Sequence, residues 1–445
     1  MRALVLASSS LSLVLIGGAL PSSATTCVVR PDGTGDFPTI QEAINHVLSG
    51  DTIELTDGVF SGNGNRDLDY LGKAIVIRSS SGNPDQCILD CEGSESAPHR
   101  GVWFDAGEGA NSILQGVTIR NGVAAGQSAP AVLGGAVLIT NNSRPTLIDV
   151  VFSDNSARSG GAIGILQGGG GFTRCRFIRN IGWWGTGGGV WGRSCTAMVD
   201  DCVFVSNRSH QAGGGATFSS SPDVTVRRCW FERNQVDWGY GAGLDFWWDT
   251  TGRVEDCSFW GNFSDDSSSY GAGFHGTRCT AVVHGCTFVG NRAGAGSAIG
   301  VESTAGIMVE NSLLALNLGS PAVHCHDGTP ELSCSDIFGN TGGDWVGCIA
   351  AQNGMDGNIS ADPLLCDAAN GDLRLHGDSP CAPEHSPAGC GLIGAQPVAC
   401  GATAIEPTTW GAIKVQVRPA EKRPADSLRL PEGGRTGGSG GGEYR

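Results

Sequence analysis

Short segments of the chain alternate apolar and polar residues with a period of two, and these segments return at a nearly constant interval. Five complete copies of the motif Cys-x-Phe-x-x-Asn end at Asn180, Asn207, Asn234, Asn262 and Asn291. Degenerate copies end at Asn155, Asn317 and Asn340. A period of two predicts β-strands, and a repeat of 23 to 29 residues predicts a solenoid.

Each unit also carries a triplet of small residues that leads into another strand. The triplets begin at Gly134, Gly160, Gly187, Gly213, Gly241 and Gly271. A unit of about 27 residues without a helical pattern cannot bury its own apolar side, whereas copies stacked as parallel strands about 4.8 Å apart can. The sequence therefore predicts an all-β chain, a right-handed parallel β-helix, whose handedness follows the usual chirality of parallel crossovers.

Stacking the units predicts which residues form vertical columns. The repeated Cys and Phe would point inward, and the repeated Asn would bond the backbone of the next rung from an inward turn. One outward column reads Asp149, Arg174, Asp201, Arg228 and Asp256. Since opposite charges on neighbouring strands attract, we interpret this column as a structural ladder.

The two ends of such a stack need covers, because an open β-helix exposes strand edges. Residues 38–47 have apolar residues at helical spacing behind Pro38, which predicts a short N-terminal capping helix. We expect a secretory signal peptide (1–24), the N-terminal cap and first strands (25–60), the β-helix with a Cys-rich C-terminal closure (61–400), and a low-complexity, disordered tail (401–445).

Composition and charge narrow the class of protein. Glycine accounts for 71 of 445 residues, which disfavours a mainly helical chain. The 28 basic and 44 acidic residues give a net charge of −16, which argues against nucleic acid and anionic membranes as partners. After the signal peptide, no segment is long and apolar enough to span a bilayer. We therefore expect a monomeric, extracytoplasmic protein, either secreted or at the cell surface.

All 17 cysteines follow the predicted cleavage site, in a compartment where disulfides persist. Side chains in register point the same way, so the stacked cysteines are predicted to be buried free thiols and not a metal site. These are Cys175, Cys202, Cys229, Cys257 and Cys286. Candidates for disulfides, with pairing left open, are Cys27, Cys87, Cys91, Cys325, Cys334, Cys348, Cys366, Cys381, Cys390 and Cys400.

The strand after each triplet alternates inward and outward, so register alone defines an outer face. Its first column reads Leu138, Gly164, Trp191, Thr217, Asp245, His275 and Gly300, and its second reads Thr140, Leu166, Arg193, Ser219, Trp247, Thr277 and Glu302. Asp245 and His275 fall on adjacent rungs, about 5 Å apart. Ligand-binding candidates are Trp183, Trp184, Trp191, Trp238, Tyr240, Trp247 and Tyr270; catalytic candidates, if the protein is an enzyme, are Asp245, His275, Glu302 and Arg193.

Three functions stay open for this face. Binding of a polysaccharide or cell-surface glycan is favoured, because flat aromatic rings pack on the apolar faces of sugars and carboxylates bond their hydroxyls. The second function is an enzyme that acts on a polysaccharide, either a hydrolase or a lyase. A glycoside hydrolase would use Asp245 and Glu302, about 10 Å apart, as paired carboxylates. A polysaccharide lyase would use His275 as base and Arg193 to neutralise a uronate. The third function is a passive spacer.

No cofactor and no metal site are expected from the sequence. Two adjacent acids, Asp265 and Asp266, give the one hint of calcium binding.

Several segments carry a resemblance to a known family. Asp32-Gly-Thr-Gly-Asp-Phe-Pro-Thr-Ile, with Gly50-Asp-Thr-Ile and Gly58-Val-Phe, resembles the N-terminal segment of pectin-lyase-like β-helices, pectinesterases included. The repeats are similar to bacterial right-handed β-helix repeat proteins of the cell surface. Asp362-Pro-Leu, Ser379-Pro-Cys and Leu392-Ile-Gly-Ala resemble their closing segment. The resemblance covers about residues 27 to 400 and implies the fold.

The resemblance implies no activity, because the motifs that carry catalysis in the family are not matched. The string Asp245-Phe-Trp-Trp is the nearest to the nucleophile motif of pectinesterases and lacks its Gly. The polygalacturonase signature, which combines a paired Asp with Gly-His-Gly and Arg-Ile-Lys, does not occur in the sequence, nor does the Arg-based signature of pectate lyases.

Overall fold

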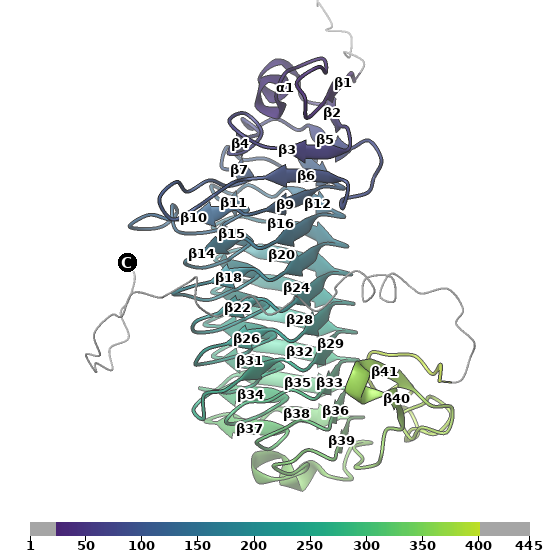
Figure 1. Ribbon diagram of the computed structural model, residues 1–445. Coiled ribbons are helices and arrows are strands. Elements are labelled where there is room, and N and C mark those ends of the chain that lie inside the picture. Colours follow the sequence, from purple (N-terminus) through teal and green to yellow (C-terminus); the bar gives the residue numbers. More distant parts are fainter. Residues whose placement is uncertain (1–23, 401–445) are drawn as a thin grey trace, which may run out of the picture. The chain divides into compact units, whose positions relative to one another are not determined.

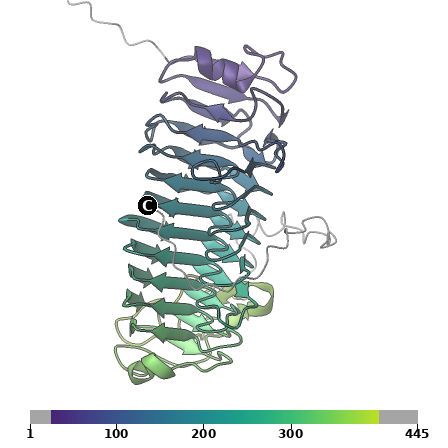
Figure 2. The ribbon, with the colours of Figure 1, turned by 90° about the vertical axis from the view of Figure 1, so that its left-hand side faces the viewer.

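The computed structural model describes residues 24–400, which form a solenoid of stacked parallel strands (Figure 1). Turned by 90°, the solenoid shows its strands lying rung upon rung (Figure 2). Four sheets run along it, here called A, B, C and D, with 12, 11, 10 and 6 strands. The predicted all-β parallel helix is therefore confirmed. The predicted signal peptide (1–24), apart from Ala24, and the predicted tail (401–445) lie outside the described residues.

The strands are short throughout, at two to five residues each. Sheet A contains β1 (Thr26–Val29), β2 (Thr52–Leu55), β5 (Val76–Ser79), β8 (Ile113–Gln115), β12 (Thr146–Ile148), β16 (Gly169–Thr173), β20 (Thr196–Asp200), β24 (Asp223–Arg227), β28 (Thr251–Glu255), β32 (Thr280–His284), β35 (Gly306–Glu310) and β38 (Glu331–Ser333). Sheet B contains β3 (Gly58–Phe60), β6 (Cys87–Asp90), β9 (Thr118–Arg120), β13 (Val151–Ser153), β17 (Arg176–Ile178), β21 (Val203–Val205), β25 (Trp230–Glu232), β29 (Ser258–Trp260), β33 (Thr287–Val289), β36 (Leu313–Ala315) and β39 (Asp336–Phe338).

The remaining elements complete each rung and close the ends. Sheet C contains β4 (Leu68–Asp69), β7 (Val102–Phe104), β11 (Val137–Ile139), β15 (Ile163–Leu166), β19 (Val190–Arg193), β23 (Ala216–Ser219), β27 (Leu244–Trp247), β31 (Phe274–Thr277), β34 (Ile299–Glu302) and β37 (Val323–His326). Sheet D contains β10 (Val123–Ala124), β14 (Ser156–Ala157), β18 (Ile181–Gly182), β22 (Arg208–Ser209), β26 (Gln235–Val236) and β30 (Phe263–Ser264). An α-helix, α1 (Ile40–His46), two 3₁₀ helices, η1 (Gly347–Gln352) and η2 (Ala368–Asn370), and the antiparallel pair β40 (Leu365–Asp367) and β41 (Asp372–Leu375) make up the rest.

One rung passes through the sheets in the order C, A, B, D. The rung that starts at β19 continues through β20, β21 and β22, and the next rung starts at β23. Its register partners lie one repeat away, as in Phe177↔Phe204↔Phe231. The linear repeat of the sequence thus becomes a set of vertical columns.

The phenylalanine column fills the interior. Neighbouring rings stack nearly parallel from Phe152 to Phe288, with centroids 4.5 to 5.0 Å apart. Offset stacking at this spacing adds to the stabilisation from burial. The predicted inward column is confirmed.

The asparagine column provides hydrogen-bond partners for backbone groups at the turn between sheets B and D. The side-chain amide of Asn207 donates to the carboxamide oxygen of Asn234 at 3.0 Å and to the carbonyl of Phe177 at 2.8 Å. The backbone N–H of Asn207 donates to the same oxygen of Asn234. Each asparagine therefore satisfies the backbone of its neighbours, and the predicted bond to the next rung is confirmed.

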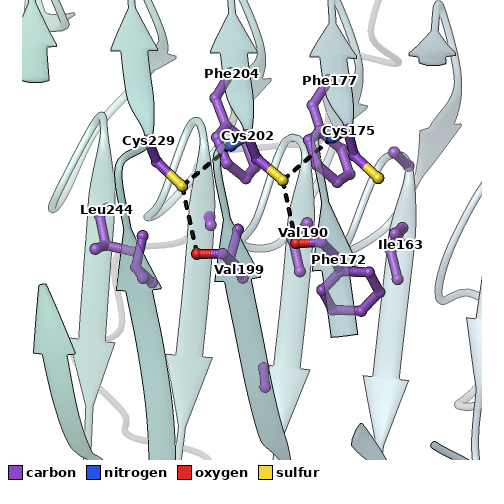
Figure 3. Close-up of a cluster of buried hydrophobic side chains, with 14 of the residues drawn as sticks. Ile163, Phe172, Cys175, Phe177, Val190, Val199, Cys202, Phe204, Cys229 and Leu244 are labelled. Atoms are coloured by element: carbon purple, nitrogen blue, oxygen red, sulfur yellow. Dashed lines mark hydrogen bonds between the residues drawn. The ribbon is translucent and has the colours of Figure 1, made fainter. Parts of the chain in front are cut away.

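The stacked cysteines are buried free thiols, as predicted (Figure 3). The sulfur of Cys202 accepts from the backbone N–H of Cys175 at 3.3 Å and faces the carbonyl of Phe172 at 3.4 Å. Burial raises the pKa of Cys202 well above its ordinary value. These thiols act as small apolar groups and not as nucleophiles.

The charged ladder on sheet A is formed in part as predicted. Arg174 binds Asp149 at 2.7 Å, whereas Arg227 and Arg228 both bind Asp200. The alternation in sign is satisfied locally and does not run evenly down one column.

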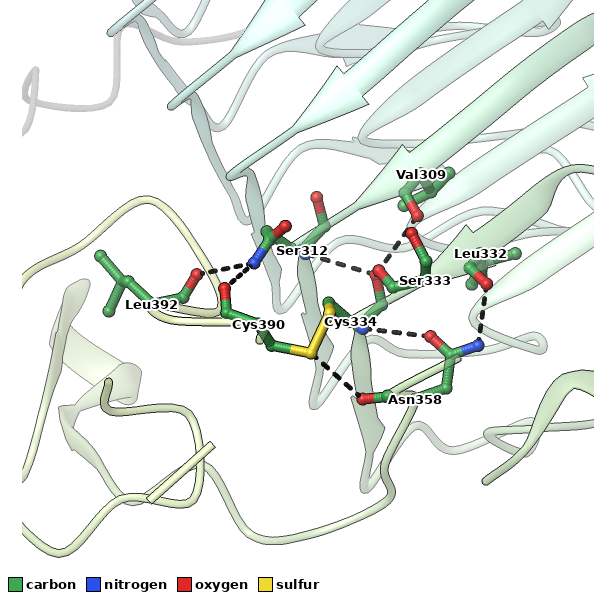
Figure 4. The surroundings of a disulfide bond; sticks show 11 residues. Val309, Ser312, Leu332, Ser333, Cys334, Asn358, Cys390 and Leu392 are labelled. Carbon is green, nitrogen blue, oxygen red and sulfur yellow. Dashed lines mark hydrogen bonds between the residues drawn. A yellow bond between two sulfur atoms is a disulfide. The ribbon is translucent and has the colours of Figure 1, made fainter. Parts of the chain in front are cut away.

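Three disulfides close the C-terminal end: Cys325–Cys348, Cys334–Cys390 and Cys366–Cys400. Figure 4 shows that Cys334–Cys390 ties the last strands to the segment around Leu392, and Asn311 donates its side-chain amide to the carbonyl of Cys390. The prediction of disulfides was wrong for four other candidates, because Cys27, Cys87, Cys91 and Cys381 are free.

The predicted capping helix is present as α1 at the N-terminal end. Ile40, Ala43 and Ile44 are its buried residues, and the Thr39 side chain accepts from the N–H of Glu42. At the C-terminal end of α1, the ammonium group of Lys73 donates hydrogen bonds to the carbonyls of Ile44 and Asn45. Among residues 24–400, no helix has the length and apolarity needed to cross a bilayer.

Candidate functional site

The outer face of sheet C has the register that the sequence predicted. The first column runs Leu138↔Gly164↔Trp191↔Thr217↔Asp245↔His275↔Gly300↔His324, and the second runs Leu166↔Arg193↔Ser219↔Trp247↔Thr277↔Glu302↔His326. Both columns continue one rung beyond the predicted set, which adds His324 and His326. Asp245 and His275 are register neighbours, as expected.

This face is covered, and the expectation of an open surface was wrong at its centre. Asp245 and His275 have 0% of their surface exposed. The first glycine of each triplet has a positive φ, +54° at Gly241, and turns the chain back over the strand that follows. A Cβ on Gly241 would lie 2.7 Å from the Cβ of Asp245. Glycine is therefore what lets the loop approach the strand closely.

The loops bring tyrosine rings onto the covered face. Tyr240 stacks on His275 with ring centroids 4.6 Å apart, and Tyr270 stacks on His324 at 5.0 Å. The two tyrosines stack on each other at 5.6 Å. We call Asp245, His275 and Glu302, together with Tyr240, Tyr270 and His324, the tyrosine–histidine cluster.

His275 links two carboxylates within this cluster. Its Nδ1 lies 2.7 Å from Oδ1 of Asp245, and its Nε2 lies 3.5 Å from Oε2 of Glu302. The hydroxyl of Thr277 lies 3.2 Å from Nε2 of His275 and donates to Glu302 at 3.3 Å. With His275 protonated, both of its ring N–H groups have an acceptor, whereas the second carboxylate oxygen of Asp245, Oδ2, is buried without a hydrogen-bond partner among residues 24–400.

The electrostatics favour the charged imidazolium. Burial alone would lower the pKa of His275, but the hydrogen bonds and negative charges of Asp245 and Glu302 outweigh burial and raise this pKa. Burial would likewise raise the pKa of Glu302, yet the hydrogen bond and charge of His275 lower it. Burial raises the pKa of Asp245, and His275 offsets part of that rise. The two acids therefore favour the protonated form of the buried imidazole.

A second group of residues, Trp184, His210 and Trp238, lies on the loops that lead into sheet C; we call it the tryptophan ridge. Both indole rings meet His210 edge to face, at centroid distances of 5.4 and 5.5 Å. The indole N–H of Trp238 donates to Nε2 of His210 at 2.9 Å, so Nδ1 is left to donate to Asp237 at 3.3 Å. Trp184 is 39% exposed and Trp238 is 45% exposed.

The other predicted residues lie in different surroundings. Trp183 is half-buried, and Trp191 packs with Trp103 and Leu166 on a small apolar cluster around Leu138. Arg193 lies three rungs from Thr277, so it is not part of the tyrosine–histidine cluster.

Trp247 is also half-buried, and its ring stacks on Trp248, which is 46% exposed. Neither Trp248 nor His324 was among the residues predicted for the site. For His324 the signal was present, since it is one repeat beyond Gly300.

Two groups of acidic residues lie close enough together to be candidate cation sites. Asp265 pairs with Arg292 at 2.5 Å, and Asp266 accepts from the backbone and hydroxyl of Ser268. Asp69, Asp105 and Glu108 have carboxylate oxygens within 4.8 Å of one another. The oxygens of buried Glu108 accept from two backbone N–H groups and the Ser143 hydroxyl, which accounts for its burial without an ion.

Comparison with known proteins supports the fold class. A family model described as "Right handed beta helix region" matches residues 161–337. No curated protein matches the chain. Together with the parallel sheets described above, this match shows that the chain has the fold of a right-handed parallel β-helix.

Solved structures with a similar chain fold include two lyases and an epimerase. Pectate lyase Pel9A has a TM-score of 0.45 at 14% identity, covering 85% of this chain and 97% of its own. A rhamnogalacturonan lyase has a TM-score of 0.28 at 10% identity, covering 76% and 87%. A periplasmic alginate epimerase has a TM-score of 0.27 at 10% identity, covering 66% and 82%. At these values the likeness says nothing about the activity of this chain.

Proposed function

We propose that this protein is secreted or displayed at the cell surface and binds a glycan through the tryptophan ridge. The three disulfides favour an oxidising compartment. The observation that carries the proposal is the fixed orientation of two exposed indoles. His210 holds both rings edge to face while their surfaces stay open to solvent. Large exposed aromatic residues held rigidly are typical of binding surfaces.

The spacing of the ridge suits an extended polysaccharide. Trp184 and Trp238 occupy loops two rungs apart, which corresponds to about 10 Å at the usual strand spacing. Two successive sugar units of an extended chain have a similar length, so alternate sugars would meet a ring. The C–H face of a sugar is apolar and packs on an indole without leaving a polar group unpaired.

The alternative function, a polysaccharide lyase or glycoside hydrolase, rests on the tyrosine–histidine cluster. Glu302 keeps 15% of its side chain exposed, and Tyr240, Tyr270 and His324 are half-buried, so the cluster reaches solvent along its edge. However, both ring nitrogens of His275 are engaged, and Asp245 is fully buried. A protonated imidazole has no lone pair to act as a base, and a buried carboxylate cannot reach a glycosidic bond. Binding is therefore the better supported function.

A polysaccharide panel tests the proposal with the full chain. Binding of immobilised or soluble polysaccharides is measured for the wild type, for Trp184→Ala/Trp238→Ala, and for Trp248→Ala as a control of equal exposure away from the ridge. We expect the double variant to bind about tenfold more weakly or worse, and the control to bind as the wild type does. Unchanged binding in the double variant would contradict the ridge.

Turnover is measured on the same panel. Release of reducing ends or unsaturated uronates, lost in both Glu302→Gln and His275→Ala, would replace binding with catalysis as the function.

A further inference from the structure

A polar pocket with a volume of about 460 Å³ lies at the corner where strands of sheet C lead into sheet A. It is at the carboxyl ends of the sheet C strands, whereas the tryptophan ridge precedes their amino ends. Its lining includes Asn142, Arg144, Gln167, Ser194, Thr196 and Pro222. Nearly all of these residues offer amide, hydroxyl or guanidinium groups. None of the lining residues belongs to the tyrosine–histidine cluster or to the tryptophan ridge, so the pocket is a separate site.

The middle rung contributes a glycine to the pocket next to Gln167. This residue, Gly168, begins a run of four glycines, residues 168–171, which separates the rung of Arg144 from the rung of Thr196. A Cβ on Gly168 would lie 2.9 Å from the carbonyl oxygen of Ser143, and a Cβ on Gly169 would lie 2.4 Å from the carbonyl oxygen of Thr196. The neighbouring rungs therefore approach the glycine backbone closely, and the middle rung has no side chain at Gly168 to fill the pocket.

Arg144 differs from the arginines of the charged ladder. Arg174 and Arg227 are paired with Asp149 and Asp200. Among residues 24–400, no hydrogen-bond or ion-pair partner is found for the Arg144 guanidinium. The amides of Asn142 and Gln167 also have no side-chain partner within that range. The pocket thus combines one unneutralised cation with several unused donors and acceptors.

We propose that this pocket binds a sugar acid, a hydroxylated ring that carries one carboxylate. The planar guanidinium of Arg144 matches a carboxylate in a two-pronged hydrogen bond. Asn142, Gln167, Ser194 and Thr196 supply donors and acceptors for ring hydroxyls. The volume lies within the range of small-molecule sites. No aromatic ring lines this pocket, so recognition here is by hydrogen bonds and charge, and it does not rest on the ridge.

Calorimetry on the full chain tests the proposal with four probes: glucuronate, glucose, acetate and inorganic phosphate. We expect saturable binding of glucuronate at one site, weaker by about tenfold or more in Arg144→Ala because charge-assisted bonds are lost. Arg144→Lys should recover only part of the affinity, because an ammonium group lacks the planar fork. Arg278→Ala is the matched control, since Arg278 is an exposed arginine at the same corner, three rungs beyond Ser194, with an equal change in charge.

The other probes and variants give results that would overturn the proposed sugar-acid site. Glucose binding as tightly as glucuronate would show that the carboxylate is not recognised, and acetate or phosphate competing equally would show an anion site that does not recognise a sugar. Either result, or equal affinity in Arg144→Ala and wild type, overturns the proposal. Trp184→Ala/Trp238→Ala should leave glucuronate binding unchanged, which separates this site from the ridge.

Discussion

The asparagine column inside the turns and the Asp245–His275 pair on sheet C are both buried and polar, but they are built in opposite ways. From Asn155 to Asn317, each asparagine bonds to the asparagine of the next rung, and these side-chain bonds join neutral groups. The Asp245–His275 pair occurs once, carries charge, and has no copy above or below it. In a solenoid, a repeated contact stabilises the architecture, whereas a contact found in one rung alone marks a specialised place.

The largest expected effect comes from breaking the repeated contact. Asn234→Ala removes the acceptor of two N–H groups of Asn207 and the donor to the carbonyl of Phe204. Three buried groups then lose a partner at about 1–3 kcal/mol each, so we expect a loss of roughly 3 kcal/mol or more. Urea unfolding measures it, with the neighbouring Gln235→Ala as control. A loss below about 1 kcal/mol would show that the column does not hold the rungs together.

Breaking the single contact should cost somewhat less. Asp245→Asn takes one of two counter-charges from a buried imidazolium, while Glu302 remains. We expect a loss of about 2–3 kcal/mol, below the 3–5 kcal/mol typical of a wholly unpaired buried charge. Asp256→Asn, an exposed aspartate on the same rung, serves as the control and should leave the free energy of unfolding unchanged. Equal stability in Asp245→Asn and wild type would mean that His275 is neutral.

The pH dependence of stability sharpens the contrast, because the asparagine column does not titrate. The raised pKa of His275 stabilises the fold most at pH values below the unfolded-state pKa, about 6.5, and this contribution is lost as pH rises through the folded-state pKa. Unfolding is followed from about pH 6 to about pH 9. The difference between wild type and His275→Gln should shrink as pH rises. A difference that stays constant or grows would contradict the charged state.

The smallest effect is expected where a contact is charged but open to water. Asp149→Ala removes the partner of Arg174 on the outer face, where both side chains are partly exposed. We expect a loss of less than about 1 kcal/mol, which falls further with added salt. A larger loss that is insensitive to salt would place this ladder with the buried contacts.

The repeat made the interior predictable and left the covered face unpredictable, for physical reasons. Phe204 and Asn207 recur with the same spacing, so one stacked solution satisfies every copy. Asp245 and His275 could be placed in register but not in their surroundings, because Tyr240 covers them from a loop whose path depends on the positive φ of Gly241.

Two further features could not be predicted from the sequence: the pairing of distant cysteines, and a pocket at a position without a side chain. Cys334 and Cys390 are 56 residues apart in a segment without a regular repeat, so spacing gave no pairing. The pocket beside Arg144 includes Gly168, a position without a side chain. Columns of side chains therefore did not indicate it.

The uniform stacking has a consequence for the distances between surface features. Because one rung bonds to the next through the same asparagine and phenylalanine contacts throughout the middle of the molecule, a whole unit could be duplicated or excised with its neighbours still matched. Each such event would slide the ridge and the pocket relative to more distant loops by one strand spacing, about 4.8 Å. Insertion or deletion of whole units, in evolution or by design, can therefore change the distance between surface features in equal steps.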